Sequence, residues 1–182
     1  MAGPDPSFLP RFSPEELKIV NDAVSLSEEL VCEFYKMSAA QWGRFRYDIR
    51  TLDCLTPDEI VFGPFAQVIR YEAKRRGSSL GSALYDFYAI CLQDHAILPL
   101  IAGLDGISLF PFMLYVTVHE LIHIVRFSRF LQYFDAGPEE RVEEEKRVHR
   151  RTHEILSPRP VPGLAPVLRH FQHTDNLLET WR

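Results

Sequence analysis

The residues with the clearest potential chemistry are His119 and His123, which enclose Glu120 in the segment His119-Glu-Leu-Ile-His123. On an α-helix, side chains four positions apart project from one face, about 40° apart around the axis, so both His can reach one tetrahedral cation. Glu120 lies beside the first His and can act as general base toward a metal-bound water. This spacing predicts a zinc site, whereas the alternative is a pair of core His that hydrogen-bond to the backbone.

The helix predicted over residues 110–134 must carry this motif into the interior of the protein. Apolar side chains lie on nearly all sides of its helical projection, a pattern typical of a buried helix. Tyr115 and Arg126 fall on the same stripe as the two His, so we expect them to stabilise an oxyanion formed at the metal. Because a buried polar group without a partner costs on the order of 1–3 kcal/mol, these side chains must find partners there.

The acidic segment 141–156 is expected to supply the remaining ligands. Its helical phase places Glu145 and His149 on the apolar side, four residues apart, and places Glu143 among the arginines of the opposite side. We therefore predict Glu145 as the third ligand and His149 as a fourth ligand or as a partner of a ligand. Two flanking residues remain as second choices, Glu144 and His153.

A third helix of the site is predicted over residues 82–98. Its apolar stripe includes His95, and Asp94 lies beside that residue. We expect His95 either to contact the metal or to orient a carboxylate that does.

The same motif also allows a dinuclear site. Glu120-Leu-Ile-His123 is an E-x-x-H, the half-motif of helical di-iron and di-manganese carboxylate proteins. In that alternative the pair Glu145 and His149 replaces the second half-motif, a bridge comes from Asp94 or His95, and the chain is an oxidoreductase. A non-catalytic metal-binding module is a further alternative.

The remaining elements are predicted from capping and periodicity. Capping boxes occur at Ser13-Pro-Glu-Glu16 and Thr56-Pro-Asp-Glu59, and a weaker one at Ser38-Ala-Ala-Gln41. Together with the apolar spacing they predict five more helices, over residues 14–23, 26–37, 39–51, 57–75 and 165–179. Residues 60–71 could alternate as a strand after the break at Gly63-Pro64, but we favour a kinked helix.

These elements predict a mainly α protein, a single domain over residues 1–182 built as a bundle of about six to seven helices. Residues 13–156 form its helical core. Residues 157–182 contain four Pro in their first ten positions and are predicted to be a proline-rich C-terminal arm with a short helix. The short link at residues 134–138 makes the last two long helices an antiparallel hairpin, which brings Glu145 back across the His face.

Composition limits the possible partners and location. At 182 residues and 46% hydrophobic content, the chain suffices for one domain with a substantial core. The net charge of −5 argues against nucleic acid as a partner, and the apolar run at residues 107–118 is too short for a membrane span. The N-terminus shows no secretory signal, and the three Cys are far apart, which favours reduced thiols and a cytoplasmic location. We expect a small molecule or a peptide as substrate; the oligomeric state is not encoded in any pattern we find.

The motif His119-Glu-Leu-Ile-His123, followed about twenty residues later by a glutamate-bearing helix, resembles the zincin metallopeptidases, and among them the gluzincin branch. The resemblance implies that the two His hold zinc, that Glu120 activates the water, and that one of the three glutamates at 143–145 is the third ligand. Spacing in the family favours Glu143, whereas helical phase favours Glu145, which we predict. The resemblance covers about forty residues and implies a zinc-dependent peptidase that binds its peptide along an edge strand.

Overall fold

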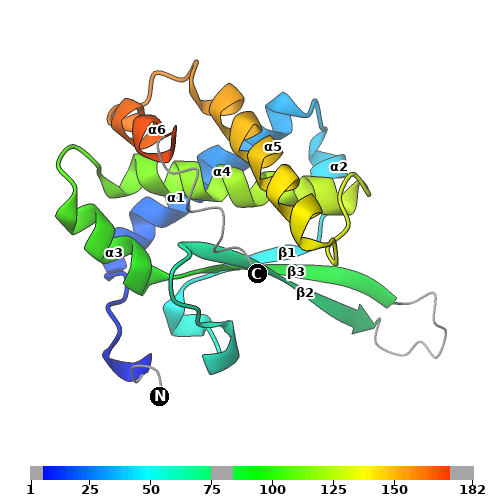
Figure 1. Cartoon of the computed structure of the whole chain (residues 1–182), viewed down its shortest axis with the longest axis horizontal. Helices are drawn as coiled ribbons and strands as arrows, with labels where there is room; N and C mark the ends of the chain where they lie inside the picture. The colour runs from blue at the N-terminus through cyan, green and yellow to red at the C-terminus, as the bar shows by residue number, and fades with distance from the viewer. Residues whose placement is uncertain (1–5, 75–83, 173–182) are drawn as a thin grey trace.

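The computed structural model describes residues 6–74 and 84–172 of the chain. Within these residues it contains six α-helices, three short 3-10 turns and one three-stranded sheet. The predicted fold class is therefore wrong: the protein is a mixed α/β structure and not a helical bundle. Figure 1 shows the helices gathered on one side of the sheet.

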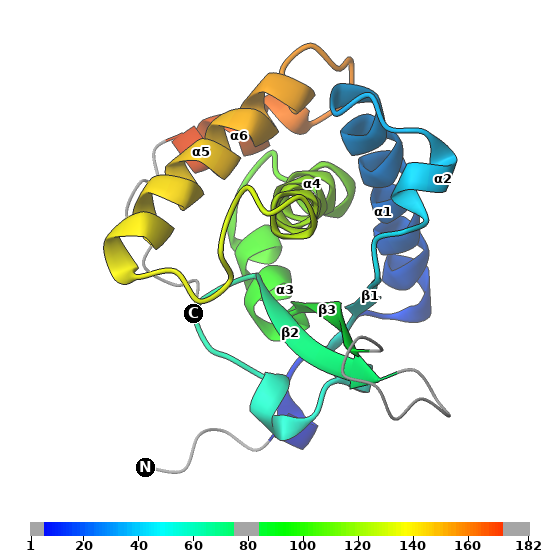
Figure 2. The same cartoon turned by 90° about the vertical axis from the view of Figure 1, so that its right-hand side faces the viewer.

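Helix α4 (Leu109–Ser128) is the centre of the fold. Every side chain of residues 111–126 is buried, as its apolar periphery predicted. Figure 2, which looks along this helix, shows it enclosed by α1 (Pro14–Phe34), α5 (Pro138–Leu156) and the sheet. The motif His119 to His123 thus lies on a helix that is held from all sides.

Helix α1 is one continuous element where the sequence predicted two, at 14–23 and 26–37. It begins at the predicted capping box, in which the Ser13 hydroxyl accepts the N–H of Glu16 at 3.2 Å. Ala23 and Ser27 are fully buried, and the Ser27 hydroxyl lies 2.5 Å from that of Thr117 on α4. Small residues at this contact let the two helix backbones approach closely.

The sheet has the order β1-β3-β2, with β1 (Tyr47–Arg50) parallel and β2 (Ala66–Lys74) antiparallel to the central β3 (Leu84–Leu92). The helices predicted over 39–51, 57–75 and 82–98 are therefore wrong in these segments. In the described part of these segments, α-helix occurs at α2 (Ala39–Trp42) and at the start of α3 (Asp94–Gly103). Residues 88–92 of β3 are buried on both faces, so their run is continuously apolar and lacks the alternation that identifies a strand.

The capping box at Thr56 closes only the 3-10 turn η3 (Pro57–Glu59). The Glu59 carboxylate accepts the Thr56 N–H at 2.7 Å and also the Tyr71 hydroxyl of β2 at 2.5 Å, which ties this turn to the sheet. A similar turn, η2 (Leu52–Cys54), precedes it. Beyond Gly63-Pro64 the chain is extended, so the strand we considered for residues 60–71 is present from residue 66.

Helix α4 ends six residues earlier than predicted, at Ser128. Phe130 takes a left-handed conformation, with φ of 55°, and the N–H of Leu131 donates to the carbonyl of Arg126 at 2.9 Å. These are features of a Schellman C-cap, with Phe130 at the position where Gly is usual. Residues 129–137, here called the α4–α5 loop, then lead into α5, which runs back across α4 as the predicted hairpin does (Figure 1).

The C-terminal region includes α6 (Leu164–Gln172), close to the start predicted at 165; residues 173–179 of that prediction lie outside the described residues. Leu164 and Val167 are buried, and Phe171 stacks on Tyr115 of α4 with ring centroids 3.9 Å apart. The 3-10 turn η1 (Pro6–Phe8) begins the described chain. All three Cys are free, as predicted.

Candidate metal centre

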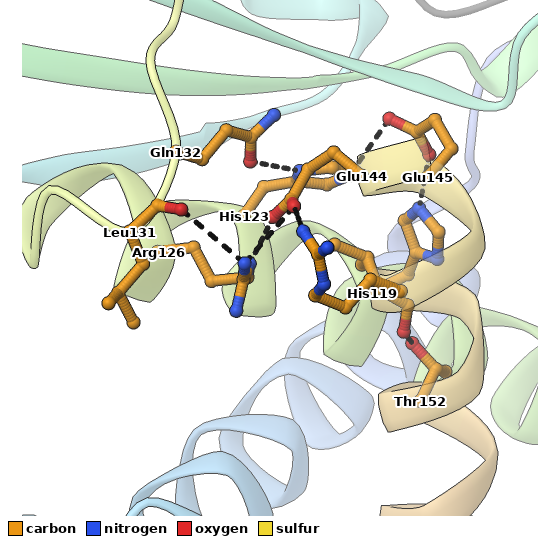
Figure 3. A network of polar contacts seen from close by, with 10 residues as sticks. His119, His123, Arg126, Leu131, Gln132, Glu144, Glu145 and Thr152 are labelled. Carbon is orange, nitrogen blue, oxygen red and sulfur yellow. Dashed lines mark hydrogen bonds and ion pairs between the residues drawn. The ribbon is translucent and has the colours of Figure 1, made fainter. Parts of the chain in front are cut away.

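Three side chains from α4 and α5 meet at one point. The Nε2 atom of His119 lies 3.2 Å from Oε2 of Glu145, and Nε2 of His123 lies 3.2 Å from Oε1 of the same carboxylate. All three residues are buried, with 4%, 4% and 7% of their surface exposed. Figure 3 shows the two His on α4 with Glu145 against them. The helical phase of α5 thus distinguished the glutamates correctly: Glu145 faces the His pair, and Glu143 is an exposed partner of Lys146 at 2.8 Å.

The spacing of these atoms fits a metal ion. The nitrogen and oxygen atoms that the three side chains offer lie within 4.8 Å of one another. Two ligand atoms at ordinary zinc distances and a tetrahedral angle lie roughly 3.3 Å apart. The 3.2 Å separations between each His nitrogen and one Glu145 oxygen agree with that edge length, so the three groups are close enough to hold an ion.

The charges at this point are tightly coupled. Burial alone would lower the pKa of His123, but the adjacent Glu145 carboxylate outweighs it and raises that pKa to about 9. Burial would likewise raise the pKa of Glu145, but His123 and His119 hold it well below its usual range. Burial lowers the pKa of His119. Without a metal, the group is therefore a protonated His123 against an ionised Glu145, and a divalent cation can replace that proton.

Glu120 is the exceptional residue of the site. Its side chain is fully buried, and neither carboxyl oxygen has a hydrogen-bond partner among the described residues. Burial raises the pKa of this carboxyl to about 8. A buried carboxyl group without a hydrogen-bond partner destabilises the fold unless a bound ligand or water supplies that partner. Glu120 is therefore a candidate functional residue.

Gln132 in the α4–α5 loop supports the site from outside. Its Oε1 atom lies 3.3 Å from Nδ1 of His123, so the imidazole can donate there and keep Nε2 directed at Glu145 (Figure 3). The sequence analysis missed this residue. A Gln in a loop has no periodicity to indicate where its side chain points.

Arg126 belongs to a different cluster. Its guanidinium forms a two-pronged ion pair with Glu144, which is 3% exposed, and Glu144 also pairs with Arg147. Its NH2 group reaches the carbonyl of Leu131 at 3.5 Å. The structure thus places the predicted oxyanion donor Arg126 and the second-choice ligand Glu144 together, beside the group of His119, His123 and Glu145 and not within it.

Tyr115 and His149 also pair with each other. The Tyr115 hydroxyl lies 2.6 Å from Nδ1 of His149, and the ring of His153 meets Tyr115 edge-on at 5.7 Å. Burial, and then the charge of Glu145, raise the pKa of Tyr115. The structure does not bring His149 into the group of side chains that could hold a metal, which consists of His119, His123 and Glu145.

His95 and Asp94 lie in another part of the fold. His95 Nε2 is 3.1 Å from the carbonyl of Val61, and the Asp94 carboxylate accepts the backbone N–H groups of Phe12 and Leu52 at 3.1 Å each. Among residues 6–74 and 84–172, His119, His123 and Glu145 are the only group of three or more such side chains close enough to hold an ion. The described residues therefore do not bring Asp94 or His95 to a dinuclear site.

An open pocket of about 70 Å³ leads to the metal group. By this measure it has room for a metal-bound water and a small part of a substrate. Its walls come from β2, α4, the α4–α5 loop and α5, and the lining residues are Val68, Glu120, His123, Phe127, Gln132, Phe134, Arg141 and Glu145. Within the described residues β2 is an edge strand of the sheet, so an unpaired strand edge lies beside the pocket.

Comparison with known proteins gives no relative: no family model matches the chain, and neither a curated protein nor a solved structure does. Helix α4 is long and apolar enough to cross a membrane, but 89% of its most apolar window is buried inside the protein. A central helix packed on all sides accounts for that composition. The function of the chain is therefore inferred from the site alone.

Proposed function

We propose that this chain is a zinc-dependent hydrolase of amide or peptide bonds, with the ion held by His119, His123 and Glu145. The observation that carries the proposal is Glu120, a fully buried carboxyl without a hydrogen-bond partner among the described residues, next to a buried His-His-Glu group. Three protein ligands are typical of catalytic zinc sites, which leave a position open for water, whereas structural sites have four.

Each residue has a distinct task in this proposal. A zinc ion held by His119, His123 and Glu145 would supply a water whose pKa is lowered to about 7 and would polarise the carbonyl under attack. Glu120 takes the proton from the attacking water and transfers it to the leaving nitrogen. Gln132 fixes the imidazole of His123 through the contact at Nδ1. The buried surroundings of Glu120, which raise its pKa toward neutrality, suit a group that both accepts and donates a proton.

The sheet supports a peptide as the substrate. The zincins that the motif resembles bind peptide along an edge strand, and the sequence had offered only one weak strand candidate for that role. Within the described residues β2 is an edge strand of the sheet, and its Val68 lines the same pocket as Glu120. An extended peptide can pair with this edge through its backbone and present one carbonyl to the metal.

The test begins with metal content. Purified full-length protein is expected to bind one zinc per chain, with the metal measured by mass spectrometry. His119→Ala and His123→Ala should each lose most of it. Two irons or two manganese ions per chain would instead favour the dinuclear oxidoreductase and contradict the proposal.

A second experiment separates zinc binding from catalysis. Glu120→Gln keeps the shape of the side chain but removes the base, so it should retain zinc and lose hydrolysis of a quenched fluorescent peptide library by about 10²-fold or more. Glu143→Gln on the exposed side of α5 is the matched control and should retain both. Zinc binding with no hydrolysis by the wild-type protein of any library peptide or of an N-acetyl amino acid would overturn the enzymatic proposal.

A further inference from the structure

The pocket has a single positively charged Arg or Lys in its lining. Arg141 lies on the first turn of α5, and the other ionisable lining residues are Glu120, Glu145 and His123. Among the described residues no carboxylate lies within ion-pair distance of Arg141, whereas its neighbour Arg147 pairs with Glu144. A guanidinium at the mouth of an otherwise acidic pocket has a charge that a ligand can complement.

The orientation of Arg141 is fixed by the backbone. Its Nε atom donates to the carbonyl of Ala136 at 2.8 Å, and Ala136 is only 8% exposed. The adjacent Asp135 pairs with Arg70 of β2 at 2.8 Å, which anchors this part of the α4–α5 loop to the sheet. With Nε engaged, the two terminal NH2 groups form the fork that binds a carboxylate with two parallel hydrogen bonds.

Another part of the pocket wall is apolar. It consists of three half-buried side chains from three elements, Val68 of β2, Phe127 of α4 and Phe134 of the loop. Arg70 lies over the ring of Phe134 at 5.0 Å and Phe127 lies 5.1 Å from it, so this wall is packed in place. A ligand that meets the metal group, the apolar wall and Arg141 at once needs a carbonyl, an apolar side chain and a carboxylate within a few bonds.

We infer that Arg141 is a specificity-determining residue that binds the free carboxylate of the substrate, and that the substrate ends in an apolar amino acid. This inference rests on the proposed hydrolytic function and names its substrate class: peptides cleaved at the C-terminal residue, or N-acyl amino acids. In such a reaction the amide C–N bond breaks. The oxygen of water joins the carbonyl carbon, and a proton goes to the leaving nitrogen, which yields a carboxylic acid and a free amino acid.

A matched pair of probes tests the role of Arg141 without requiring turnover. N-acetyl-L-phenylalanine and N-acetyl-L-phenylalaninamide differ only in the carboxylate, and calorimetry on the full chain measures the affinity of each. We expect wild-type protein, loaded with zinc, to bind the acid at least about tenfold more tightly than the amide. Arg141→Met should abolish this preference and Arg141→Lys should retain part of it.

Arg150→Met is the control, because it removes the same charge from the exposed side of α5. It should leave the preference for the acid unchanged.

The same titrations on metal-free protein distinguish the two proposals, since a carboxylate can also bind zinc directly. An equal preference in wild type and Arg141→Met overturns the inference whatever the metal content. Failure to bind zinc overturns the proposed hydrolase, while a preference that Arg141→Met abolishes in metal-free protein still supports this carboxylate site.

Discussion

Two buried clusters lie side by side between α4 and α5, and their charges are balanced in different ways. In one, Glu144 meets Arg126 and Arg147, so that a buried carboxylate has two cations. In the other, Glu145 meets two His, and Glu120 beside them has no partner among the described residues. The first cluster is complete as it stands and joins two helices. In the second cluster a bound cation would compensate the negative charge of the carboxylates. We therefore interpret the first cluster as a structural ion pair and the second as a metal site.

The distinction between the two clusters would be wrong if Glu145 could be removed without loss of zinc affinity. Glu145→Ala deletes one of three proposed ligands, so the affinity for zinc should fall by more than about 10²-fold. A competition titration with a chromophoric chelator measures the change. Zinc affinity within a factor of a few of wild type would show that Glu145 belongs with Glu144 as a structural residue.

Removal of Arg126 should instead affect folding. Arg126→Met leaves Glu144 buried with only the half-exposed Arg147, and we expect the free energy of unfolding in urea to fall by about 3 kcal/mol. Combining it with Glu144→Leu should restore much of the loss, because the uncompensated charge is then gone. A double variant as unstable as the single one would mean that packing, and not the ion pair, is what Arg126 contributes.

The stability contributed by the cluster of Glu145 and its two His should also depend on pH. Because Glu145 raises the pKa of His123 from 6.5 to about 9, their attraction stabilises the metal-free protein fully below pH 6.5 and is lost as the pH rises through about 9. Zinc needs His123 deprotonated, so its effect runs the other way. The increase in melting temperature caused by zinc should therefore grow between pH 6.5 and pH 9, by an amount equivalent to roughly 1–3 kcal/mol. A zinc effect that is constant over this range would contradict the assignment of His123 as ligand.

The smallest effect is expected at the third glutamate of the run. Glu143 is exposed and its ion-pair partner among the described residues is Lys146, so Glu143→Ala should leave both the free energy of unfolding and the zinc affinity close to those of the wild type. Thermal melts with and without zinc measure both. Loss of metal in this variant would favour the family spacing over the helical phase on which our assignment depends.

The helical parts of the site were predictable because their periodicity is strong. A helix apolar on all sides must be central, and α4 is; on α5 the phase of the apolar residues alone separates Glu145 from Glu143. The sequence analysis also expected His149 to face inward, and it does contact a buried group, but that group is Tyr115 and not the metal cluster. Helical phase predicts on which side of a helix a residue lies, but it does not predict which side chain that residue will contact.

The sheet could not be predicted by the same reasoning. Tyr88, Ile90 and Leu92 belong to the core beside α4 and the alternate residues of β3 are buried too, so this strand has the composition of a buried helix. A strong capping box at Thr56 favoured a helix that stops after one 3-10 turn. His95 was assigned to the site because a helix through residues 82–98 was assumed. The strand ends at Leu92 and α3 begins at Asp94, which breaks that register.

The α4–α5 hairpin also bears on the order of folding. His119 and Glu145 are 26 residues apart, so the whole proposed ligand set lies within one helix-loop-helix unit. Closing a loop of this length costs little chain entropy, and local contacts of this kind form early. We therefore expect a metal ion to bind once this hairpin has formed, before the rest of the domain packs around it. Zinc would then speed folding as well as stabilise its product, and chelation during refolding should slow the recovery of native structure more than chelation afterwards.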